Sequence, residues 1–254
     1  MTPALEINQL TGGYSQRRPV LHGISFTVEP GRMTGLIGLN GAGKSTTIKH
    51  ILGLMLPHSG EVRVAGVKLE EDRDRFRSSC AYVPEQPSLF PNLTVAEHLR
   101  WTAMAYGIEP GEAENRTAKL AETFRMDKAM GNLPDTLSKG MKQKVMLMNA
   151  LLVSPPLLII DEPFLGLDPL ATRALTGALD DARAQGSAIL LSSHILPALE
   201  RRADNLVVLH QGRIIASGTP EEVKKQAGGA PTLDDAFETL VLDAEQGGGS
   251  KLGR

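Results

Sequence analysis

GLNGAGKST, Gly38 to Thr46, is the stretch of sequence that decides the fold. It satisfies the GxxxxGK[ST] pattern of a phosphate-binding loop, and it lies between an apolar run, Arg32 to Gly38, and a segment with helical apolar spacing. In such a loop the glycines let backbone amides point at phosphate groups, and the N-terminus of the following helix favours negative charge. We expect Lys44 to contact the β- and γ-phosphates of a nucleotide and Ser45 to ligate magnesium. The residues expected to line the phosphates are Gly38, Asn40, Gly41, Ala42, Gly43, Lys44, Ser45 and Thr46.

A second motif, LLIIDEP from Leu157 to Pro163, is an apolar strand that ends in two acidic residues. Its two carboxylates come at the carboxyl end of the strand, where α/β sheets bind ligands. We expect Asp161 to hold magnesium and Glu162 to act as the catalytic base that orients a water for attack on the γ-phosphate. In isolation, an acidic pair after an apolar strand is more often a solvated strand end. The phosphate loop upstream makes the functional interpretation the stronger one.

His194 ends another apolar strand, AILLSSH, and is expected to emerge at the same sheet edge. There it is a candidate catalytic residue in contact with the γ-phosphate. A structural or surface histidine is the alternative interpretation, and without the other motifs it would be the better one.

The bulk composition describes an ordinary globular chain. Hydrophobic residues make up 41% and charged residues 22% of the 254 residues, which argues against a largely disordered protein. The net charge of -2 gives no attraction to nucleic acid, so no nucleic-acid partner is expected. The single cysteine, Cys80, favours a reducing cytoplasm. The most apolar region, Val145 to Ile160, is interrupted by polar residues and prolines, so no direct membrane insertion is expected.

The order of patterns along the chain predicts an α/β fold with an insertion. Strand-like alternation near the start indicates an antiparallel β subdomain, and helical spacing from about 94 to 152 indicates an inserted helical lobe. Strands then alternate with a helix, as expected of a parallel sheet. We predict one domain over 1–227, a linker and docking helix over 228–246, and a flexible tail over 247–254 of the kind that cloning leaves behind.

These pieces, in this order, resemble the ABC ATPases. LSKGM, Leu137 to Met141, resembles the family signature LSGGQ, and FLGLDP contains the D-loop with Asp168. The resemblance implies a P-loop NTPase fold with a RecA-like core, and ATP and Mg2+ as cofactors. It also implies a head-to-tail dimer in which the signature of a second ATPase subunit closes on the ATP of the first. Ser138 and Gly140 would then contact nucleotide in trans, Ser138 also being a good N-cap for the helix that follows. Tyr14 matches the aromatic residue that stacks on adenine, with a core aromatic at a strand end as the alternative.

The sequence departs from the family pattern at three places. Alignment by eye puts Glu85 at the position of a glutamine that reaches magnesium, with Gln86 one place later, and both stay candidates. Lys139 and Met141 replace a glycine and a glutamine of the signature. Leu165 stands at a D-loop position that is commonly serine.

The resemblance implies that this chain powers a separate transmembrane permease subunit, from a cytoplasmic, peripheral position on the inner face of the membrane. Details of several motifs are similar to the Ecs-type exporter ATPases of Gram-positive bacteria, so export is the expected direction. An importer ATPase is the main alternative, and a soluble ABC ATPase acting on nucleic acid or ribosomes is a remote one. Large apolar residues in or near the helical lobe would suit a groove for a permease helix, unless they are simply lobe core: Leu89, Phe90, Trp101 and Tyr106.

Overall fold

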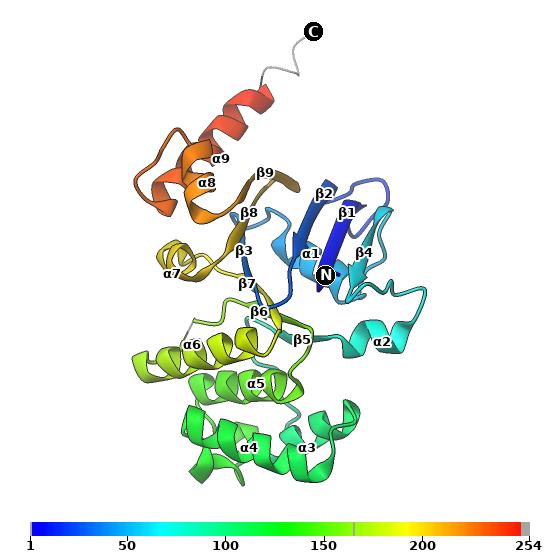
Figure 1. The fold of residues 1–254 in the computed structure, drawn as a ribbon, viewed down its shortest axis with the longest axis vertical. Helices are drawn as coiled ribbons and strands as arrows, with labels where there is room; N and C mark the ends of the chain where they lie inside the picture. Colours follow the sequence, from blue (N-terminus) through cyan, green and yellow to red (C-terminus); the bar gives the residue numbers. More distant parts are fainter. Residues whose placement is uncertain (1, 165, 250–254) are drawn as a thin grey trace.

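The computed structural model describes residues 2–164 and 166–249 of the chain, and Figure 1 shows their arrangement. A six-stranded sheet in the order β5-β6-β7-β3-β8-β9 forms its centre. The first five of these strands are parallel, and β9 closes the edge as an antiparallel hairpin with β8. The strands are β3 (Met33–Ile37), β5 (Cys80–Val83), β6 (Leu157–Asp161), β7 (Ala188–Ser192), β8 (Asn205–His210) and β9 (Arg213–Gly218).

The central strands are buried on both faces, which explains their continuous apolar sequences. Along β6, Leu158 and Ile160 pack on the side of the helical lobe, while Leu157 and Ile159 pack on the side of the second sheet. Parallel sheets covered on both faces typically read as apolar runs rather than as alternating patterns. The sheet therefore separates two hydrophobic cores.

A second, antiparallel sheet in the order β2-β1-β4 covers one of these cores. Its strands are β1 (Leu5–Gly12), β2 (Leu21–Val28) and β4 (Ser59–Val64). In β1, Leu5 and Ile7 face the core, as the alternation predicts. An irregularity at Gln9, which has a positive φ of 48°, shifts the pattern by one residue, so that Leu10 faces the core as well. This sheet confirms the predicted antiparallel subdomain.

The helices divide between the core domain and a helical lobe inserted between β5 and β6. The lobe contains α3 (Val95–Ala105), α4 (Pro110–Phe124) and α5 (Lys139–Val153). Thr94 and Glu97 form a capping box that fixes the start of α3. The remaining helices are α1 (Lys44–Ile51), α2 (Arg73–Ser78), α6 (Pro169–Ala184), α7 (Leu196–Arg202), α8 (Pro220–Gln226) and α9 (Leu233–Gly249). The α/β fold with an inserted helical lobe is thus confirmed.

The C-terminal part differs from the prediction at one point. The helix α9 continues to Gly249, so residues 247–249, predicted to begin a flexible tail, belong to a helix. The rest of the predicted tail, 250–254, lies outside the described residues. In the described part of the chain, no helix is both long and apolar enough to cross a membrane.

Candidate nucleotide site

The phosphate loop joins β3, in the middle of the sheet, to the start of α1. Two of its glycines are required by the geometry. Gly43 precedes the helix with φ 114°, a conformation that side chains disfavour, and a Cβ at Gly38 would lie 2.6 Å from the carbonyl oxygen of Leu209. Among the described residues no side chain caps α1, so the amides of its first turn are left for a ligand. The loop is therefore shaped to receive an anion.

Lys44 reaches back across this loop. Its Nζ donates to the carbonyl oxygens of Gly38 at 2.6 Å and Leu39 at 3.3 Å. Burial lowers the pKa of Lys44, and the carboxylates of Glu162, Asp161 and Glu85 oppose that shift. The partly buried ammonium thus stands among acidic groups, and phosphate oxygens would satisfy it better than loop carbonyls do.

Strand register brings Asp161 to the carboxyl end of the sheet, where the phosphate loop follows β3. Asp161, the last residue of β6, pairs with Ser192 of β7, and Ser192 in turn pairs with Leu36 of β3. The hydroxyl of Ser192 donates to the Asp161 carboxylate. Burial raises the pKa of Asp161, and this hydrogen bond partly offsets the rise. The sequence analysis missed Ser192, where β7 ends two residues before the expected His194, although its place after the apolar run in AILLSSH was a usable signal.

Glu162 follows in an unusual backbone conformation. Its φ is 50°, which is uncommon for a residue with a side chain, and its amide donates to the carbonyl oxygen of Ser192 at 3.0 Å. The residue is only 8% exposed. Such strained positions concentrate at functional sites, where the surrounding structure holds them.

His194 contacts the predicted catalytic base. Its Nδ1 lies 2.8 Å from Oε2 of Glu162, and its backbone amide donates to the same oxygen at 3.3 Å. The histidine ring is otherwise largely exposed. The structure therefore brings His194 to the predicted sheet edge, with the carboxylate of Glu162 as its partner.

Glu85 and Gln86 follow β5 and are both exposed. The negative charge of Glu85 acts on Lys44, where it opposes the lowering of the pKa by burial. Gln86 carries no charge, so this effect does not decide between the two residues, and both stay candidates.

Tyr14 is 68% exposed, so its interpretation as a core aromatic is wrong. Its hydroxyl lies 3.0 Å from Nζ of Lys49, which stands 5.0 Å from the centroid of the ring. That hydrogen bond lowers the pKa of Tyr14. Because Lys49 belongs to α1, the helix that starts at the phosphate loop also positions this aromatic ring.

Ser138 caps α5 as expected, accepting a hydrogen bond from the Met141 amide at 3.2 Å. Asp168 caps α6 in the same way, accepting from the Ala171 amide at 2.8 Å. Within residues 2–164 and 166–249, neither side chain bonds to the phosphate loop. Gly140 lies close to the D-loop, since a Cβ there would stand 3.1 Å from the carbonyl oxygen of Gly166. Leu165 lies outside the described residues.

The acidic groups suit Mg2+ held jointly with phosphate. Asp161 and Ser45 supply hard oxygen donors, which magnesium prefers, and it usually takes only one or two protein carboxylates together with phosphates. Over the described ranges there is no group of three or more His, Cys, Asp or Glu side chains that would hold a metal alone. This arrangement fits a cation that arrives with the nucleotide.

The predicted apolar groove residues divide between core and surface. Phe90 and Trp101 are 67% and 63% exposed, and Met104 of the same helix as Trp101 is exposed as well. Leu89 packs against the core, and Tyr106 is partly fixed by donating to the carbonyl oxygen of Cys80 at 3.0 Å. The lobe-core interpretation is therefore right for Leu89 and wrong for Phe90 and Trp101.

Comparison with known proteins agrees with this geometry. A family model described as "ABC transporter" matches residues 21–165. The "ABC-type transporter ATP-binding protein EcsA" of Bacillus subtilis (strain 168) is 49% identical over 239 residues, which are 94% of this chain and 95% of that protein. The "Nod factor export ATP-binding protein I" of Rhizobium meliloti (strain 1021) is 38% identical, covering 86% of this chain and 65% of that protein.

Solved structures give the same answer. A structure described as "Structure of ATP binding subunit of ABC transporter" superposes with a TM-score of 0.91 at 48% identity, covering 94% of this chain and 99% of that one. The resemblance to Ecs-type ATPases drawn from the motifs is confirmed by the identity to EcsA. With a phosphate loop, a strand-end acidic pair and these matches together, the chain belongs to the family of ABC transporter ATP-binding proteins.

Proposed function

We propose that this chain hydrolyses ATP to power transport by a separate transmembrane permease, and that it works as a head-to-tail pair. In each site Lys44 contacts the β- and γ-phosphates, while Ser45 and Asp161 hold Mg2+. Magnesium, when bound, neutralises charge on the phosphates and supports attack on the γ-phosphate. Glu85 or Gln86, both in the loop after β5, completes the edge of the site, and Tyr14 stacks on adenine.

The observation that carries this proposal is the placement of Glu162. Its carboxylate is buried beside the acidic edge of the sheet, accepts a hydrogen bond from the His194 backbone amide and lies 2.8 Å from Nδ1 of the same residue. A carboxylate fixed in this way is suited to orient water and to accept its proton, while the histidine keeps the acceptor oxygen in place. His194 thus positions the carboxylate of Glu162, and it contacts the γ-phosphate once nucleotide is bound.

The test is Glu162→Gln, which keeps the shape and removes the base. Turnover should fall by about 10²- to 10⁴-fold while ATP still binds, because the phosphate contacts of Lys44 remain. The measurement is steady-state phosphate release together with equilibrium binding of ATP. Glu238→Gln, an exposed site on α9, is the matched control and should be silent. Unchanged turnover in Glu162→Gln would remove this residue from its role.

Dimerisation is proposed from the exposed cap of α5. Ser138 is exposed, and the first turn of α5 carries no acidic residue. This helix terminus is therefore open to a phosphate of a second copy. Since Glu162→Gln retains ATP, it should accumulate ATP-bound dimers in sedimentation velocity runs.

Export as the direction rests on similarity to the relatives. The chain is 49% identical to EcsA and 38% identical to a protein named for Nod factor export. The permease partner would dock on the lobe surface around Phe90 and Trp101, placing this chain at the cytoplasmic face of the membrane.

A further inference from the structure

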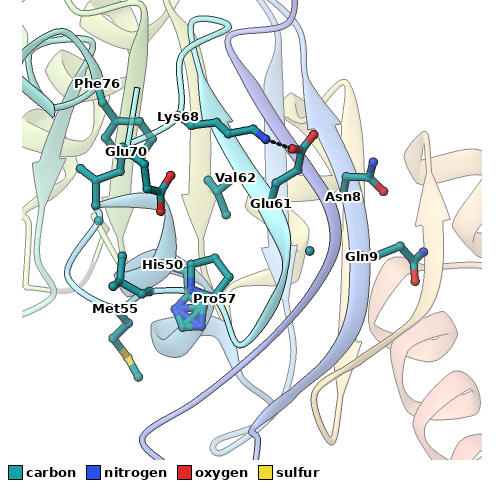
Figure 2. Close-up of a pocket in the computed structure, with 14 residues that line it drawn as sticks. Asn8, Gln9, His50, Met55, Pro57, Glu61, Val62, Lys68, Glu70 and Phe76 are labelled. Carbon is teal, nitrogen blue, oxygen red and sulfur yellow. Dashed lines mark ion pairs between the residues drawn. The ribbon is translucent and has the colours of Figure 1, made fainter. Parts of the chain in front are cut away.

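A second cavity lies away from the nucleotide site, between the end of α1, strands β1 and β4, and α2. Its volume is about 680 Å³, within the range of small-molecule sites. Apolar walls are contributed by Met55, Pro57, Val62, Leu69 and Phe76. None of the predicted nucleotide-contacting residues lines it. Figure 2 shows the Val62 and Glu70 side chains pointing toward the space near His50 and Pro57.

His50 is a buried polar group of this cavity that has no partner. It is 2% exposed, and in the described part of the chain neither Nδ1 nor Nε2 makes a hydrogen bond. Burial lowers its pKa to about 4, so at neutral pH the ring has one N–H donor and one lone pair to offer. Leaving such groups unpaired is costly, and each one needs an explanation.

The charged groups of the cavity indicate which ligand would fit. Glu61 and Glu70 are acidic and Lys68 is basic, so two negative charges and one positive charge leave a net charge of -1. Lys68 forms an ion pair with Glu61, which leaves Glu70 as the carboxylate free of an ion pair among the described lining residues (Figure 2). Apolar walls with an excess negative charge favour an organic cation over an anion.

The cavity is also connected to the nucleotide site through α1. His50 packs so closely on Gly12 that a Cβ there would lie 1.9 Å from its Nε2, and Gly12 is two residues before Tyr14. The residue before His50, Lys49, donates to the Tyr14 hydroxyl. A ligand that moved His50 would therefore act on Lys49, which holds the Tyr14 hydroxyl, and on Gly12, two residues before that ring.

We propose that this cavity is a binding site for a small amphiphilic organic cation. The apolar body of the ligand lies against the apolar walls, and its ammonium lies near His50 and Glu70. On binding, the His50 ring moves so that its lone pair accepts a hydrogen bond from the ammonium, and Glu70 supplies the opposing charge. Occupancy changes the affinity for ATP through Tyr14.

The probe is 2-phenylethylamine, with 3-phenylpropionate as an anion of similar size. Met55 is observed through its methyl resonance in the full chain labelled at methionine methyls. The cation should shift this resonance saturably and bind about tenfold more tightly than the anion. His50→Phe should weaken the cation by about tenfold because the acceptor is lost. Leu69→Trp should fill the cavity and abolish the shift, whereas Leu242→Trp on α9 should leave it intact.

Glu70→Gln keeps the proposal testable if either cavity variant fails to fold, because it changes an exposed side chain. It should remove most of the preference for the cation. Equal binding of cation and anion, a response that survives Leu69→Trp in a folded protein, or a preference untouched by Glu70→Gln would each overturn the proposal. The coupling is read separately, as a shift in ATP affinity on adding the cation. A loss of hydrolysis in Glu162→Gln leaves this cavity unaffected, so the two proposals fail independently.

Discussion

Asp161 and Glu162 are neighbours in sequence, yet their surroundings give them different chemistry. Asp161 ends a buried strand, where burial raises its pKa and Ser192 donates to it. Glu162 turns away with a positive φ and meets His194. One residue of displacement at a strand end therefore separates the proposed metal ligand from the proposed base. The separation depends on the backbone conformation of Glu162, which holds its side chain in a different direction.

Replacing Asp161 should make the nucleotide-free protein more stable. The raised pKa means that the native state binds this proton more tightly than the unfolded chain does, so the stabilisation is present at acid pH and is lost as pH rises from 3.8 through the higher folded value. At pH 7 the ionised carboxylate is therefore destabilising, and Asp161→Asn should raise the melting temperature by a few degrees.

Thermal unfolding at pH 7 and at pH 5 measures this effect, and the gain should shrink at the lower pH. Magnesium-dependent hydrolysis should be lost in the same variant. Glu238→Gln on α9 is a suitable control, since that side chain is exposed and lies outside the nucleotide site. A lower melting temperature for Asp161→Asn at pH 7 would show that the attraction to Lys44 outweighs the cost of burial.

At the scale of elements, helix starts do two kinds of work in this chain. Thr219 caps α8 in a reciprocal capping box with Glu222, and this serves the helix alone. Ser138 caps α5 without an acidic partner in the first turn, so the dipole of that helix remains open to an external anion. The start of α1 has no side-chain cap from any residue in the described ranges. The less a helix start is satisfied internally, the better it suits a phosphate.

The two capping residues provide a matched pair of variants. Ser138→Ala and Thr219→Ala should each reduce the free energy of unfolding by about 1 kcal/mol, because each removes the bond that the hydroxyl accepts from a first-turn amide. Only Ser138→Ala should also reduce ATP-dependent dimerisation and turnover. Denaturant titrations and sedimentation with ATP separate the two effects. Equal turnover in both variants would mean that the α5 terminus serves only its own helix.

The two ends of the molecule along its long axis are built from different helices. Figure 1 shows the lobe of α3, α4 and α5 at one end and α8 with α9 at the other, with the central sheet and the phosphate loop between them. The exposed Phe90 and Trp101 lie in the segment that enters the lobe and on α3. Exposed aromatic residues of this kind are typical of protein interfaces.

Removing the exposed aromatics should separate partner binding from hydrolysis. Phe90→Ser with Trp101→Ser should leave the ATPase activity of the isolated chain within about twofold, since neither side chain lies at the phosphate loop. The same variant should fail to copurify with a multispanning protein from detergent-solubilised membranes. Leu54→Ser, which removes an equally exposed residue outside the lobe, is the control. Copurification unchanged by the double substitution would place the docking surface elsewhere.

The sequence by itself determined the phosphate loop, the acidic strand end and the α/β class, because these depend on local spacing. Local sequence alone sets the backbone preferences of Gly38 and Gly43 and the apolar character of β6. The capped start of α5 at Ser138 was likewise local. The succession of strand, helix and strand along the chain also indicated a parallel sheet, but not the order of the strands within it.

Only the tertiary structure decided which distant residues meet. Ser192 reaches Asp161 because β7 pairs with β6 in one register, and His194 reaches Glu162 because both follow those strands. Exposure of Trp101 and burial of His50 depend on how helices pack on the sheets. Side chains that share a helical or apolar pattern in sequence look alike until packing assigns one face to water and the other to the core, since burial is a property of the whole fold.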